Sequence, residues 1–119
     1  MLPAYYTRES DDGVDYRVDS AREAAAAIIT RRALGLGGGM VIANPIPFEA
    51  SMDRSVIDAA IDTALGAADD LGITGKETTP FLLGRIVELT GTASLDANVA
   101  LVLDNARVAS QIATAIGQY

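Results

Sequence analysis

An α/β fold with about four helices and two to three strands is what this sequence predicts. The apolar run MVIA, residues 40–43, does not alternate with polar residues, which is typical of a parallel strand covered on both faces. A stripe of apolar residues at helical spacing from Val56 to Leu71 predicts an amphipathic helix. A strand with two buried faces needs neighbouring strands and covering layers, which the chain does not obviously supply. One interpretation is that these residues belong to a larger α/β domain or need a partner chain to complete the sheet.

Two shorter segments are predicted to be strands or extended chain. Residues 3–7 (PAYYT) and 14–18 (VDYRV) are rich in aromatic and β-branched residues, and a polar stretch separates them. Residues 40–43 supply the third strand, and because they are apolar throughout they are expected to form the central strand of the sheet.

The four helices are predicted from signals at their ends. Ser20 and Glu23 fit a capping box, so a helix is expected from residue 21 to about 34, closed by Gly35. The start and stop residues expected of the other three helices are Asp53 or Ser55 with Gly72, Thr79 (before Pro80) with Gly91, and Ser94 as the cap of the last helix.

The bulk composition is that of one globular domain at most. The 119 residues are 50% hydrophobic and 21% charged, which is ordinary for a folded chain. Sixteen acidic residues against nine basic ones give a net charge of −7, and no basic run occurs, so binding to nucleic acid along its phosphates is not expected. The acidity is interpreted as a solvated surface that keeps the protein in solution.

The chain contains neither cysteine nor histidine. Disulfides, thiolate zinc sites, Ser-His-Asp triads and Cys-His dyads are therefore excluded within it, and its chemistry must use Asp, Glu, Lys, Tyr, Ser, Thr or Asn. The first residues lack a secretory signal pattern, and no run approaches the ~20 apolar residues of a membrane span. The sequence therefore predicts a cytoplasmic protein without a membrane partner.

The glycines at 35 and 37–39 do not predict a phosphate-binding loop. Their spacing matches neither GxGxxG nor GxxxxGKS/T. Nucleotide-binding glycines follow a strand and open a helix, whereas these follow a helix and precede the predicted strand. They are interpreted as a helix stop and a tight turn.

Asn44 is the strongest candidate binding residue. It ends the predicted central strand, where open α/β sheets place their ligands. Pro45 excludes the helical conformation at Asn44 and Pro47 keeps the following loop extended, so the amide is held in a defined position. An amide both donates and accepts hydrogen bonds, which suits a sugar hydroxyl or a nucleobase edge. The alternative is that Asn44 only bonds the backbone of its own turn.

A second candidate site lies in GITGKETTPFL, residues 72–82. A glycine-flanked loop that leads into a helix N-terminus, which could accept an anion, contains Lys76, Glu77, Thr78 and Thr79. The alternative is a plain helix cap at Thr79 beside two solvated charges.

Three stretches carry a family resemblance. They are YRVDSAREAA (16–25), RRALGLGGGMVIANPIP (31–47) and the run from GITGKETTPFLL to ARVAS (72–110). They closely resemble the C-terminal part of the pseudouridine-5'-phosphate glycosidases, also called the indigoidine-synthase-A-like family, over nearly the whole chain. The resemblance implies that residues 1–119 are the C-terminal portion of such a domain, whose fold is an α/β/α layered one.

The resemblance also implies an activity. The family reversibly cleaves the carbon–carbon glycosidic bond of pseudouridine 5'-phosphate to give uracil and ribose 5-phosphate. A lysine forms an imine with the opened ribose, a glutamate donates a proton, and a manganese ion is held through an aspartate and waters. In the family these groups lie in the N-terminal two thirds. Members are typically trimeric, so a homo-oligomer, or a partner chain carrying the N-terminal part, is expected.

Asn44 is the residue that the resemblance carries over, because it matches the asparagine of the family's NPxP motif, which lies beside the bound ribose or base. Lys76 is the only lysine, and its stretch does not match the motif around the imine-forming lysine. No catalytic or metal-binding residue is therefore expected here, and the isolated chain is expected to be inactive. The alternative is a non-catalytic assembly chain, or a relic that keeps only this part of the fold.

Overall fold

The computed structural model describes all residues from Met1 to Tyr119, and its regular structure is entirely helical. The elements in chain order are α1 (Ala21–Ala33), the 3-10 turn η1 (Phe48–Ala50), α2 (Arg54–Asp70), the 3-10 turn η2 (Gly75–Glu77), α3 (Thr78–Thr90) and α4 (Thr92–Ile116). The four predicted helices are present, but none of the predicted strands is. The expectation of an α/β fold is therefore wrong for this chain.

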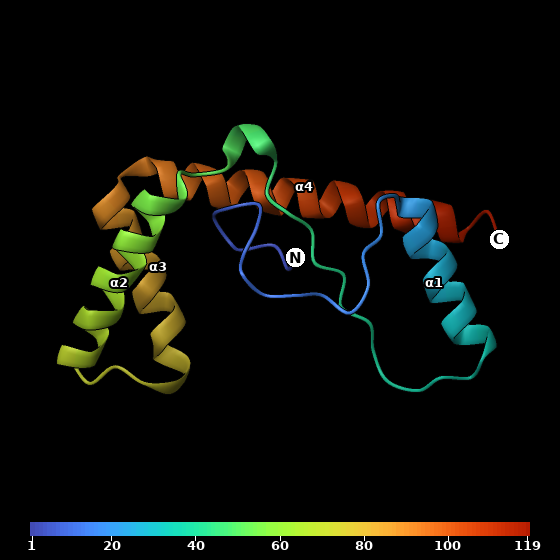
Figure 1. The fold of residues 1–119 in the computed structure, drawn as a ribbon, viewed down its shortest axis with the longest axis horizontal. Helices are drawn as coiled ribbons and strands as arrows, with labels where there is room; N and C mark the ends of the chain where they lie inside the picture. Colours follow the sequence, from blue (N-terminus) through green and yellow to red (C-terminus); the bar gives the residue numbers. More distant parts are fainter.

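The molecule is elongated, with α4 along its long axis and the shorter helices across it (Figure 1). α4 spans the molecule, α2 and α3 form a hairpin at one end of it, and α1 lies at the other end. Extended chain on either side of α1 runs beside the middle of α4. The radius of gyration is 17.2 Å, against roughly 13–14 Å for a compact domain of this length. The chain is therefore open rather than closed around one core.

The predicted strands fail because none of them pairs with another strand; their one backbone hydrogen bond is donated by the amide of Met52 to the carbonyl oxygen of Tyr6 (2.9 Å). No backbone group of residues 40–43 takes part in a backbone–backbone hydrogen bond, and Val41 is 95% exposed. Residues 3–7 and 14–18 lie in irregular chain. A strand exists only through pairing with another strand, so an apolar run without a partner stays extended and unpaired.

The predicted helix ends are largely confirmed. Ser20 Oγ accepts a hydrogen bond from the backbone amide of Glu23 (3.2 Å), and the Glu23 carboxylate accepts from the amide of Asp19 (2.8 Å) rather than that of Ser20. Asp53 caps α2 through the amides of residues 55 and 56. Gly35 and Gly72 have φ of 65° and follow the ends of α1 and α2, where this left-handed conformation favours glycine.

Two predicted caps are wrong. α3 begins at Thr78 after η2, and no side chain caps it, so Thr79 lies inside the first turn. α4 begins at Thr92, because Gly91 with φ 65° reverses the chain directly after α3. Ser94 is therefore not a cap: it lies within the first turn of α4 with 1% of its surface exposed, and its hydroxyl has no partner.

The core lies where the α2–α3 hairpin meets α4 and the extended chain. It consists of Tyr6, Ile46, Ile57, Ala64, Ile86, Ala97 and Leu101. Only 13 of 119 residues are buried. Of the predicted stripe on α2, Ile57, Ala60, Ala64 and Ala68 are buried, while Val56, Leu65 and Leu71 are exposed. Much of the apolar surface of the chain therefore lacks a covering layer.

The last helix, α4, is both long and rich in apolar residues. By length and composition alone, this 25-residue helix could cross a membrane. This corrects the expectation that no segment approaches that requirement. The helix nevertheless contains the ion pair of Asp104 with Arg107 and contacts α1 and α3. Core helices of globular domains have the same composition, so this property is weak evidence for a span.

Candidate functional site

Asn44 lies against the middle of α4. Its side-chain nitrogen Nδ2 donates to Asp104 Oδ2 at 2.8 Å and to Asn105 Oδ1 at 3.1 Å. Asn44 makes no hydrogen bond to the backbone of its own turn, so the alternative interpretation as a turn residue is not what the structure shows. Because an ionised carboxylate can only accept, the nitrogen end of the amide must face Asp104, and the carbonyl oxygen Oδ1 remains free to accept.

Asp104 is itself held by a second partner. Arg107, one turn further along α4, donates to Asp104 Oδ1 through Nε (2.9 Å) and Nη2 (2.6 Å). The Asp104 side chain is 15% exposed. The hydrogen bond from Asn44, followed by that from Arg107, lowers the pKa of Asp104 below its ordinary value, and the charge of Arg8 adds to this. Asp104 is therefore an ionised acceptor at neutral pH.

The extended segment that carries Asn44 is anchored on its other side as well. Ile46 is fully buried in the core, and its carbonyl oxygen accepts from Arg8 Nη1 at 2.6 Å. Tyr5 donates its hydroxyl to Asn98 Oδ1 at 2.7 Å, which ties the N-terminal segment to α4. Proline on both sides of Ile46 restricts the backbone. Asn44 thus sits on a segment whose path is fixed independently of its own side chain.

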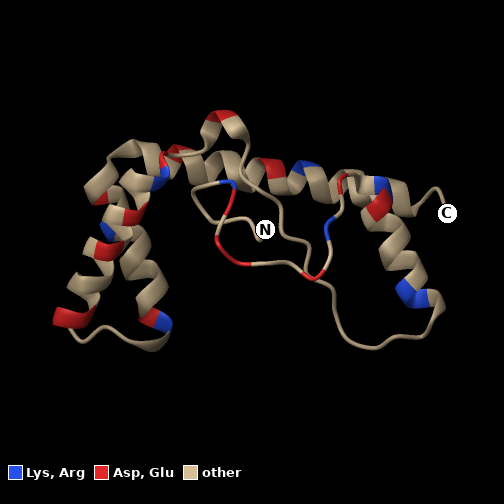
Figure 2. Ribbon diagram, in the orientation of Figure 1, with Lys and Arg blue, Asp and Glu red and all other residues tan.

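The second candidate site is not brought near Asn44. Lys76 and Glu77 belong to η2, in the connection at the free end of the α2–α3 hairpin (Figure 1). Both are exposed, and neither forms an ion pair. Figure 2 shows the basic residues scattered singly or in pairs along the chain rather than gathered on one face. Nothing in the structure adds a ligand-binding role to this loop.

Sequence reasoning missed the partners of Asn44 on α4. The dipeptide Asp104-Asn105 directly follows the apolar run VALVL (99–103) within a helix, and that interruption was the available signal. A carboxylate in the apolar middle of a long helix needs a polar partner when it is half-buried. The pattern does not say which residue, 60 positions away in the sequence, would supply that partner.

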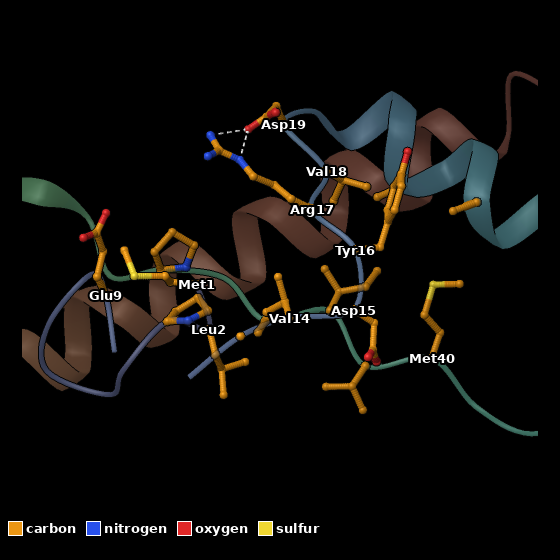
Figure 3. A pocket seen from close by; sticks show the side chains of 18 of the residues that line it. Met1, Leu2, Glu9, Val14, Asp15, Tyr16, Arg17, Val18, Asp19 and Met40 are labelled. Carbon is orange, nitrogen blue, oxygen red and sulfur yellow. Dashed lines mark hydrogen bonds and ion pairs between the residues drawn. The ribbon is translucent and has the colours of Figure 1, made fainter. Parts of the chain in front are cut away.

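A groove lies beside the extended segment that carries Asn44. This groove has a volume of about 930 Å³ and is lined by 20 residues, 11 of them hydrophobic. Figure 3 shows Leu2, Val14, Tyr16 and Met40 among its walls, with the ion pair of Arg17 and Asp19 (2.7 Å) close by. Asn44 does not line it, although both its chain neighbours do. Its lining combines apolar side chains with charged ones, among them Arg8 and Arg17.

The residues of this chain do not fit a manganese site. No three acidic, histidine or cysteine side chains gather in a way that could hold a metal ion. Manganese prefers several oxygen ligands around one point. No step of the chemistry is therefore assigned to a metal held by this chain.

Comparison with known proteins places the chain in a class. Residues 1–115 match the family described as indigoidine synthase A like protein, and the chain belongs to that family. Among its relatives are pseudouridine-5'-phosphate glycosidases of Hahella chejuensis, 53% identical over 94% of this chain, and of Escherichia coli, 50% identical over 94%. The chain spans 37% and 36% of the lengths of these two relatives.

A solved structure resembles the fold. The prealnumycin C-glycosynthase AlnA, determined in complex with ribulose 5-phosphate, matches with a TM-score of 0.81 and 30% sequence identity. The match covers 95% of this chain and 37% of AlnA. The arrangement of helices and extended segments seen here is therefore shared with part of a larger protein.

Acid should weaken the link between Asp104 and Asn44. Because the pKa of Asp104 is lowered on folding, its contribution to stability is present above the ordinary value of 3.8 and is lost as the pH falls through the lower folded value. We expect the free energy of unfolding of the wild type to fall more steeply below pH 3.8 than that of Asp104→Asn. Other carboxylates titrate in both proteins and cancel in the difference. Parallel curves from chemical unfolding in this range would contradict the assignment.

Proposed function

We propose that this chain is the C-terminal part of a pseudouridine-5'-phosphate glycosidase, which reversibly cleaves the carbon–carbon bond between uracil and ribose 5-phosphate. The observation that carries the proposal is the identity of 50% or more to such glycosidases from two bacteria over 94% of the chain. AlnA supports it from chemistry, since its name describes the formation of a C-glycoside and its structure contains a phosphorylated five-carbon sugar.

The catalytic groups are proposed to lie outside this chain. Cleaving a carbon–carbon glycosidic bond differs from ordinary glycoside hydrolysis, because no heteroatom leaving group is available for an acid to protonate. An imine between a lysine and the opened sugar supplies an electron sink instead. Lys76 is the only lysine here, and it is exposed at the far end of a hairpin without a partner that would activate it. The imine-forming lysine and the manganese ligands are therefore assigned to the rest of the fold.

The role proposed for this chain is to bind and orient the substrate through Asn44. The amide is held in place by α4 while its carbonyl oxygen stays free. A phosphorylated nucleoside does not cross membranes unaided, so the enzyme is proposed to work in the cytoplasm, where its substrate is. Half-buried polar groups on a fixed segment are the usual means of orienting such a ligand.

The remaining part of the family fold is proposed as the partner of this chain. The groove beside residues 39–43 and the exposed apolar side chains around it are the surface that it would cover. That part is supplied by a longer chain or by a separate subunit, and the completed protein is proposed to be a trimer. An open chain with so much apolar surface supports such an arrangement, because surface of this kind is usually buried against protein.

The proposal is tested by incubation of the purified chain with pseudouridine 5'-phosphate and manganese. The chain alone should release no uracil above a no-protein control, and a mixture with the N-terminal part of the Hahella chejuensis relative should release it. Turnover by the chain alone would contradict the assignment of the catalytic groups. Lys76→Ala would then show whether Lys76 is the nucleophile, because borohydride would trap the imine in the wild type only.

A further inference from the structure

We infer that Asp104 is a positioning residue that fixes the orientation of the Asn44 amide, so that Asn44 offers the ligand only a hydrogen-bond acceptor. The inference rests on the proposed function of this chain as a substrate-binding part. It adds a residue on α4 that local sequence patterns did not single out. The substrate group that contacts Asn44 must then be a hydrogen-bond donor.

The orientation of the amide follows from the partners of its nitrogen. An asparagine side chain has two N–H donors on Nδ2 and one carbonyl acceptor. Both donors of Asn44 are used on α4, one by the Asp104 carboxylate (2.8 Å) and one by the Asn105 carbonyl oxygen (3.1 Å). Rotation of the amide by half a turn would place its carbonyl oxygen against a carboxylate, which is repulsive. Only Oδ1 of Asn44 is therefore left for a ligand.

Asp104 can fix the Asn44 amide because each of its two carboxylate oxygens accepts hydrogen bonds from a different residue. Arg107 occupies Oδ1 through two N–H groups, and Oδ2 faces Asn44. The guanidinium fixes the carboxylate plane and keeps it ionised. With its side chain only 15% exposed, Asp104 is also shielded from much of the competing water.

A merely structural role for the contact is the rival explanation. The segment that carries Asn44 is already anchored by the buried side chain of Ile46 and by the hydrogen bond from Arg8 to the Ile46 carbonyl. The Asp104 contact is therefore not needed to hold the segment against α4. What it does, and the other contacts do not, is set which end of the Asn44 amide points outward.

A free acceptor limits what the ligand can present at this point. On a pseudouridine 5'-phosphate molecule the donors are the ribose hydroxyls and the N–H groups of uracil. The dianionic phosphate and the carbonyl oxygens of uracil have only acceptor atoms, so they are excluded as partners of Asn44. Asn44 is thus assigned to the sugar hydroxyls or to a uracil N–H.

The test uses exchange of the two side chains in the assembly of this chain with the N-terminal part of the Hahella chejuensis relative. Asp104→Asn should raise KM, with a total loss in kcat/KM of about 5- to 20-fold. Asn44→Asp alone should be worse, because it brings two carboxylates together. The double variant Asn44→Asp/Asp104→Asn restores a donor–acceptor pair and leaves an acceptor facing the ligand, so it should recover most of the loss. Asp62→Asn, an exposed residue of α2 without an ion pair, is the matched control.

Two outcomes separate the inference from the proposed function. An inactive wild-type assembly would refute the proposed function, whereas an active assembly in which Asp104→Asn leaves KM unchanged and the exchange recovers nothing would refute only the positioning role. A second readout does not depend on activity. The chain has three asparagines, Asn44, Asn98 and Asn105, so selective ¹⁵N labelling gives three side-chain amide signals. Asp104→Asn adds a fourth signal, from position 104, and the Asn44 signal should shift; an unchanged Asn44 signal would overturn the inference.

Discussion

At micromolar concentration the isolated chain is expected to sediment as an associated species rather than as a monomer. Val41 is 95% exposed, and Met40 and Ile42 beside it are 44% and 39% exposed. They line the groove of about 930 Å³. Contiguous apolar patches beyond a few hundred Å² usually associate. Val41→Asp should shift the population toward monomer, because it places a charge in the centre of this patch.

The matched control for that experiment is Leu71→Asp. Leu71 is 67% exposed at the end of α2 and does not line the groove. This variant should associate as the wild type does. A compact wild-type monomer that binds no hydrophobic dye, as judged by sedimentation velocity, would contradict the expectation that residues 40–43 are a covered surface in the completed protein.

Asn44→Ala is expected to lower the kcat/KM of the completed protein by roughly 5- to 150-fold, which corresponds to a loss of ~1–3 kcal/mol when a ligand group shielded from water is left unpaired. The same variant removes a partner of Asp104, so a modest drop in melting temperature should accompany it. Turnover and thermal unfolding measured on one preparation separate the two effects.

Asn98→Ala is the control for that substitution. Asn98 also lies on α4 and accepts a hydrogen bond from Tyr5 across two distant segments. Its loss should lower the melting temperature to a similar extent while turnover of the folded enzyme stays close to that of the wild type. Wild-type turnover in a destabilised Asn44→Ala variant would remove Asn44 from the substrate site and leave it a structural residue.

The helices could be predicted from the sequence because their signals are local. A serine three residues before a glutamate fixes the start of α1, and glycines that accept a positive φ fix the ends of α1 and α2. The start of α4 was misplaced because Ser94 resembles a cap, whereas the single Gly91 already reverses the chain. Where two residues near one turn could each mark the start of a helix, the sequence alone does not decide which of them does.

The strands could not be predicted correctly because strand formation is not local. The run at 40–43 has the composition of a buried strand, yet its backbone has no partner within this chain. The candidate site shows the same difference between local and non-local features. Asn44 stood out through the two prolines that follow it, but its contact with Asp104 joins residues 60 positions apart. Such a pairing depends on how the extended segment crosses α4, which no local pattern encodes.

The most direct test of the central claim, that this chain is one part of a glycosidase completed by the rest of its fold, is a titration. The N-terminal part of the Hahella chejuensis relative is added to a fixed amount of this chain, and uracil release from pseudouridine 5'-phosphate is followed. The rate should rise from zero and saturate at a ratio of one to one, and Val41→Asp should need a higher concentration to reach the same rate. No release at any ratio, or a rate that does not depend on this chain, would contradict the claim.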